Sequence, residues 1–112
     1  MDESRARALL QAERDEVATL LRETEAAARL DEQAPDGPAD YGDAALPLTE
    51  EANDAAVAAQ LRNRLGVIDR ALARLEAGTY GRSVLSGKPI PDQRLEADPA
   101  AELTIEEARA DR

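Results

Sequence analysis

The chain has 112 residues and a formal net charge of −10, and it contains no cysteine, histidine, phenylalanine or tryptophan. Hydrophobic residues make up 43% of it, but much of this is alanine, which favours thin helix-on-helix packing over a thick aromatic core. The composition excludes disulfides, and the negative charge with only two tyrosines argues against direct binding of DNA or RNA.

Residues 3–30 form the first predicted element. This segment has no glycine or proline and is rich in strong helix formers, so it predicts an amphipathic helix. Its apolar stripe comprises Leu10, Val17, Leu20, Leu21 and Ala27. Charges begin at Asp2, and no apolar run approaches the roughly 20 residues that span a bilayer, so we expect no secretory signal, no membrane segment and a cytoplasmic location.

Residues 33–48 are expected to form a loop, because three prolines and two glycines interrupt the helical pattern. This loop lies in the most acidic part of the chain: from Leu30 to Leu61 there are eight acidic residues and no lysine or arginine. Such a segment suits a basic protein surface or a bound cation as partner.

The second helix shows the clearest pattern. Its apolar residues follow spacings of 3, 4, 3, 4 and 3, which is an a/d seam that packs on a partner helix: Ala58, Leu61, Leu65, Ile68, Leu72 and Leu75. Gly78 is a stop signal for it. We therefore predict an antiparallel helical hairpin of the coiled-coil type over residues 1–78, monomeric because both stripes are buried within one chain.

Residues 79–112 form a small module with few apolar residues. Thr104 followed by Glu106 and Glu107 predicts the start of a short C-terminal helix. Ser83 and Ser86 are separated by two residues and flanked by glycines, as in a metal-binding knuckle, but no histidine is present to activate either hydroxyl. No catalytic pair or phosphate-binding glycine loop can be identified, so the sequence predicts a mainly α protein that is not an enzyme.

Three stretches resemble the DksA/TraR regulators of bacterial RNA polymerase: ALARLEAGTYG at 71–81, GRSVLSGKPIP at 81–91 and RLEADPAAELTIEE at 94–107. In addition, DYGDAA at 40–45 fits the D-x-x-D-x-A pattern that this family carries at the tip of its hairpin. Each stretch alone is weak, but their order and spacing together are specific. The resemblance covers residues 40–107, and the first helix by pattern only.

The resemblance implies that the hairpin enters the secondary channel of the polymerase. It places Asp40, Asp43 and Ala45 at the tip, near the active site, where negative charge perturbs metal and basic contacts. The alternative for the two aspartates is that they only cap turns in a solvated loop. A different basic protein as the partner of an acidic hairpin, and a dimeric coiled-coil adaptor, are the rival interpretations.

The family's four zinc-ligand positions correspond to Ser83, Ser86, Thr104 and Glu107. Zinc is held by thiolates and imidazoles, and this set offers one anionic ligand and three poor ones, so no zinc is expected. We therefore predict a degenerate, zinc-free finger, insensitive to zinc shortage and thiol oxidation.

Two further expectations come from the resemblance. Arg94 and Glu96 are candidates for a polymerase contact, with a local ion pair as the alternative. The positions that alarmone-responsive members use for guanosine tetraphosphate carry no cation here, so we expect a weak or absent response to that nucleotide. Those positions are Gln60, Val67 and Ala108, and the cations that remain as alternatives are Arg62, Arg64 and Arg94.

Overall fold

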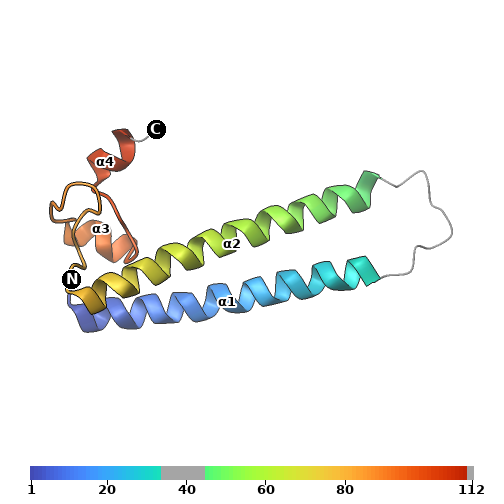
Figure 1. The fold of residues 1–112 in the computed structure, drawn as a ribbon, viewed down its shortest axis with the longest axis horizontal. Helices are drawn as coiled ribbons and strands as arrows, with labels where there is room; N and C mark the ends of the chain where they lie inside the picture. Colours follow the sequence, from blue (N-terminus) through green and yellow to red (C-terminus); the bar gives the residue numbers. More distant parts are fainter. Residues whose placement is uncertain (34–44, 111–112) are drawn as a thin grey trace. The chain divides into compact units, whose positions relative to one another are not determined.

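The computed structural model describes residues 1–33 and 45–110, with side chains described for 1–30 and 52–110. Within these ranges the fold is mainly α, as predicted (Figure 1). The helices are α1 (Glu3–Gln33), α2 (Ala45–Ala77), α3 (Asp92–Ala97) and α4 (Ile105–Ala110). The described residues form no helix long and apolar enough to cross a membrane.

The long helices extend further than the sequence pattern predicted. The expected loop at 33–48 is wrong at both ends, because α1 continues to Gln33 and α2 already begins at Ala45. Pro47 is tolerated in α2 because it lies in the first turn, where the backbone N–H groups have no intrahelical acceptor. At the other end of the pair, α1 begins after Asp2, whose carboxylate accepts a hydrogen bond from the Ser4 N–H at 3.3 Å.

Gly78 ends α2 with a Schellman motif. The Thr79 N–H donates to the Arg74 carbonyl at 2.9 Å, and the Gly78 N–H donates to the Leu75 carbonyl at 3.3 Å. The motif needs a left-handed residue after the last helical turn, and Gly78 has a φ of 77°. The end of the helix predicted at Gly78 is thus confirmed, and the C-terminal module follows directly after it.

The chain divides into two compact units. The terminal unit comprises Met1–Asp15 and Gly66–Arg112, and the central unit comprises Glu16–Leu65. Because α1 and α2 each run through both units, the same pair of antiparallel helices contributes to each of them (Figure 1).

In the terminal unit, α1 and α2 pack through large, fully buried side chains. Leu10 of α1 and Ile68 of α2 are both 0% exposed. Beside them, ion pairs join Arg7 to Glu76 and Arg14 to Asp69, the second at 2.7 Å. The partners are seven residues apart on both helices, so the charges repeat with the heptad and favour this one antiparallel register.

The module covers this end of the helix pair with a small core of its own. Ile90, Leu95 and Ala101 are buried together, and Met1 and Tyr80 pack against them. The Tyr80 hydroxyl donates to a backbone carbonyl, that of Pro99, at 2.8 Å, and burial raises the pKa of this phenol. Tyr80 is therefore a packing anchor of the module.

The central unit has a thinner interior. Among its described side chains only Val17 and Ala58 are buried. Leu20 and Ala27, which we predicted in the apolar stripe, are exposed, so that part of the prediction is wrong. Two helices bury one narrow stripe each, and residues beside the stripe stay in water.

Candidate functional site

The finger loop, residues 82–89, carries two of the four positions that correspond to the zinc ligands of the DksA/TraR regulators. Arg82 and Pro89 form an isolated antiparallel bridge, and the Ser83 N–H donates to the Lys88 carbonyl at 2.8 Å. The Gly87 N–H turns back to the Ser83 carbonyl at 2.9 Å, and Gly87 has a φ of 76°, which other residues rarely adopt. The glycine-punctuated stretch therefore folds as a tight, closed knuckle.

Ser83 organises the tip of this loop. Its side chain is buried, and its Oγ accepts hydrogen bonds from the N–H groups of Leu85 and Ser86, at 3.1 and 3.2 Å. These are the donors that a thiolate at the same position would meet. A hydroxyl can serve them equally well as a neutral acceptor, so the turn does not need a metal to close it.

Thr104 and Glu107 form the other half of the site and start α4. The Thr104 N–H donates to Glu107 Oε1 at 3.0 Å, and the Glu107 N–H donates to Thr104 Oγ1 at 3.3 Å. This reciprocal pair is a capping box. The helix start predicted at Thr104 is confirmed. Glu107, the N3 residue of the capping box, is the one acidic residue among the four positions that correspond to zinc ligands.

The carboxylate of Glu107 joins the two halves. The Ser83 hydroxyl, the Thr104 N–H and the Ser86 hydroxyl favour its ionised form and lower its pKa from 4.5 to about 2. The four positions that correspond to the zinc ligands of the DksA/TraR regulators thus lie around one negative charge. We call Ser83, Ser86, Thr104 and Glu107 the carboxylate network.

Zinc does not fit this network. Ser83 Oγ already accepts hydrogen bonds from two backbone N–H groups, and Glu107 Oε1 accepts one from the Thr104 N–H. Two serines, a threonine and a single carboxylate also lack the thiolates and imidazoles that hold structural zinc. Across the described ranges, no group of three or more metal-binding side chains is present.

A second set of charges, which the sequence analysis missed, fastens the module to α2. Glu102 accepts two hydrogen bonds from Arg70, at 2.9 and 3.2 Å, and lies 3.4 Å from Arg74. The bidentate contact with Arg70, followed by the charge of Arg74, lowers the pKa of Glu102. Helical spacing places both arginines on one face of α2, but nothing in the sequence shows that a residue 28 or more positions away meets them.

Arg94 and Glu96 both make contacts inside the terminal unit. Glu96 forms an ion pair with Arg5 of α1 at 2.8 Å, and Arg94 Nε donates to the Leu103 carbonyl at 2.7 Å. Both residues lie on α3, a short helix that the sequence analysis did not predict. The local ion pair that we considered as the alternative is therefore present for Glu96, while Arg94 binds a backbone carbonyl, and contact with polymerase stays a prediction for both.

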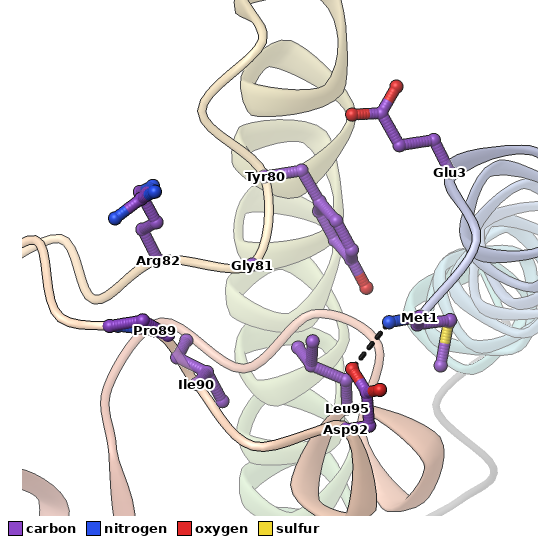
Figure 2. Close-up of a pocket in the computed structure, with 9 residues that line it drawn as sticks. All are labelled: Met1, Glu3, Tyr80, Gly81, Arg82, Pro89, Ile90, Asp92 and Leu95. Carbon is purple, nitrogen blue, oxygen red and sulfur yellow. Dashed lines mark hydrogen bonds and ion pairs between the residues drawn. The ribbon is translucent and has the colours of Figure 1, made fainter.

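A cavity of about 260 Å³ lies between the start of α1 and the module (Figure 2). Its lining includes Tyr80, Ile90 and Leu95, with an ion pair between the Met1 ammonium and Asp92 at its edge. Charged side chains such as Glu3 and Arg82 share its lining with the apolar ones, so it is a depression open to solvent and not an enclosed void.

Asp40 and Asp43 lie outside the described residues, and Ala45 is the first residue of α2. Of the cations considered for a nucleotide, Arg62 is paired with Glu25 at 3.2 Å. Counted from its sequence, the central unit holds 11 acidic and four basic residues. Most of the chain's net charge of −10 thus belongs to this unit.

Comparisons with known proteins find relatives of this chain in two bacteria. The chain is 34% identical over 98 residues to the RNA polymerase-binding transcription factor DksA of Caulobacter vibrioides, a match that covers 88% of this chain and 61% of the relative. It is 41% identical over 70 residues to YteA of Bacillus subtilis, covering 62% of this chain and 29% of that protein. The chain thus spans less than two thirds of these relatives.

A solved structure is similar over nearly the whole chain. The transcription factor DksA2 of Pseudomonas aeruginosa matches with a TM-score of 0.84 and 28% identity, covering 97% of this chain and 81% of that one. No family model matches the chain.

Proposed function

Because this chain is a homologue of the DksA family, without the cysteines of a zinc finger, we propose that it is a regulator of transcription that binds bacterial RNA polymerase directly. The observation that carries the proposal is the similarity to an RNA polymerase-binding factor over 88% of the chain, together with the shared fold. Transcription factors of this family are not enzymes, and neither is this protein. Its partner implies a cytoplasmic location.

We further propose that the hairpin acts through its acidic end. The aspartates at 40 and 43 stand in a segment without a single cation from Leu30 to Leu61, so an approaching surface meets only negative charge there. Such a segment suits the secondary channel, where carboxylates can perturb the catalytic magnesium and the basic groups around it. In this proposal the two long helices carry the acidic segment, and the C-terminal module, which follows α2, holds the helices together within the terminal unit.

The module does this without zinc. In the proposed mechanism the carboxylate network and the Arg70–Glu102 contact fix the module on α2, so the hairpin is presented independently of the supply of metal. Since no cation stands at Gln60, Val67 or Ala108, we expect guanosine tetraphosphate to add little to the effect.

The decisive test combines binding and transcription. Purified protein should compete with a known secondary-channel ligand for polymerase and should change the lifetime of promoter complexes in vitro. Replacing Asp40 and Asp43 by Asn should leave binding within about twofold, because few contacts are lost, while removing most of the transcriptional effect. The matched control is Asp31→Asn with Asp36→Asn, which makes the same charge change in the same acidic segment.

Two results would contradict the proposal. If the protein binds polymerase but does not compete for the channel, the insertion mechanism is wrong. If it does not bind polymerase and instead captures a different basic protein, the rival interpretation of an acidic interaction protein holds. Light scattering on the free protein tests the expectation of a monomer against the dimeric adaptor.

A further inference from the structure

Glu102 lies beside two arginines of α2 that are one helical turn apart. Its carboxylate accepts hydrogen bonds from Arg70 Nε at 2.9 Å and from Arg70 Nη2 at 3.2 Å, whereas Arg74 Nη1 lies 3.4 Å from the same carboxylate. The close bidentate contact therefore belongs to Arg70, and Arg74 has one long contact with Glu102. A single carboxylate thus serves two cations unequally.

The burial of the two arginines runs in the opposite sense. The side chain of Arg70 is 58% exposed, whereas that of Arg74 is 14% exposed. An exposed ion pair contributes little to stability because water solvates its charges, but a buried charge is costly unless it is paired. The cation with the better contact is therefore the one that needs the contact less.

Two nitrogen atoms of Arg74 are also left without an acceptor. Nε and Nη2 are buried, and neither has a hydrogen-bond partner in the described part of the chain. Buried polar groups in proteins are nearly always paired, so an unpaired guanidinium indicates a second arrangement in which it is served better. Nη2 lies next to Nη1 in the planar guanidinium, and Nη1 already contacts Glu102.

From these contacts we propose that Glu102 is a two-position switch, whose carboxylate moves from Arg70 to Arg74 when another anion takes Arg70. The movement is short, because the carboxylate already lies within 3.4 Å of both guanidinium groups. It exchanges an exposed bidentate contact for a buried one and supplies Arg74 with an acceptor. The inference goes beyond the proposed function, since it concerns the free protein.

The switch affects the finger loop, because Glu102 is bound through its backbone as well as its side chain. Its carbonyl accepts a hydrogen bond from the Val84 N–H at 2.9 Å, while its carboxylate binds α2. Glu102 therefore links the finger loop to the helix. With two arginines available, an anion that binds the exposed Arg70 leaves this link intact, and the module stays attached to α2 in both positions.

NMR signals of the Arg74 guanidinium nitrogens test the switch directly. Arg70→Gln removes the exposed cation and should transfer Glu102 to Arg74, so these signals should shift. The matched control is Arg14→Gln, which breaks another ion pair of the same unit, that with Asp69, and should leave them unchanged. If the Arg74 signals of Arg70→Gln coincide with those of the unmodified protein, Glu102 does not move and the inference is wrong.

Unfolding in denaturant gives a second, independent measurement. Arg70→Gln should raise the unfolding equilibrium constant by less than about fivefold, because Arg74 takes over the carboxylate. Glu102→Gln should raise it at least about tenfold, because both cations lose their partner.

The same substitution in a chain without Arg74 separates a switch from a fixed pair. In the background of Arg74→Gln, Arg70→Gln should raise the unfolding equilibrium constant about fivefold more than it does alone, since no second arginine remains for Glu102. An equal effect of Arg70→Gln in both backgrounds would show a fixed Arg70–Glu102 pair and would overturn the inference. Neither measurement involves polymerase, so the proposed function is tested separately.

Discussion

The terminal and central units are built from the same two helices, yet they differ in what they bury. In the terminal unit, Leu10 and Ile68 are completely inaccessible, and Ile90 and Leu95 add a second buried cluster. In the central unit, the buried side chains among those described are Val17 and Ala58, and alanine contributes little area.

The difference shows what a third layer adds to a pair of helices. Two helices alone bury one stripe each, whereas the module gives the terminal unit a second apolar contact and a network of hydrogen bonds. Stability should therefore be concentrated in the terminal unit. In the proposed function this division is useful, because one unit has to hold its geometry while the other meets a partner.

Hydrogen exchange should show the largest effect, and α2 supplies its own control. Amides of residues 66–75, in the terminal unit, should exchange at least about tenfold more slowly than those of residues 52–61, because local opening there must break the better-packed core. Exchange measured by NMR or mass spectrometry tests this directly. Equal protection along α2 would mean that the two units unfold as one.

Core truncation should give the next largest effect. Leu95→Ala removes a side chain that is 2% exposed, and we expect the free energy of unfolding to fall by about 2–5 kcal/mol, since a cavity remains. The control Leu20→Ala removes the same atoms from a side chain that is 45% exposed. It should change the free energy of unfolding by no more than about 0.5 kcal/mol. Denaturant titration distinguishes them, and similar losses would contradict the comparison.

A smaller effect is expected inside the carboxylate network. Ser83→Ala leaves the Leu85 and Ser86 N–H groups without their acceptor and should cost about 1–3 kcal/mol of unfolding free energy. Ser86→Ala, at an exposed position of the same loop, should cost less than about 1 kcal/mol. If the two variants were equally stable, the hydrogen bonds accepted by Ser83 Oγ would not be what closes the finger loop.

The dependence of stability on pH should be the smallest and the most specific effect. The pKa of Glu107 is about 2 in the folded protein, below its ordinary 4.5, so its ionised form stabilises the fold. That contribution is complete above about pH 4.5 and is lost as the pH falls through about 2.

In the Glu107→Gln variant the side chain at this position cannot titrate. The free energy of unfolding of this variant should therefore fall less between pH 4.5 and 2 than that of the unmodified protein. Subtracting the two denaturation curves also removes the effect of Glu102, whose pKa is lowered as well and which is present in both proteins. Parallel curves from pH 4.5 to 2 would show that Glu107 does not stabilise the finger through its charge.

The sequence by itself determined the local features of this protein. Helix formers without glycine or proline gave the first helix, the heptad seam gave the second, and Gly78 and Thr104 marked where helices stop and start. These signals act over one or two turns of chain, so they can be read without knowing the fold. The resemblance to the DksA/TraR regulators likewise pointed to the four positions of the carboxylate network before any contact was known.

Only the tertiary structure decided which of these residues meet. Three features depend on contacts between distant segments: both serines stabilise the charge of Glu107, Glu102 binds Arg70, and Glu96 pairs with Arg5. Burial was decided in the same way, since Leu10 and Leu20 belong to one predicted stripe and end at 0% and 45% exposure. Periodicity gives the face of a helix, but what covers that face depends on the other segments that pack against it.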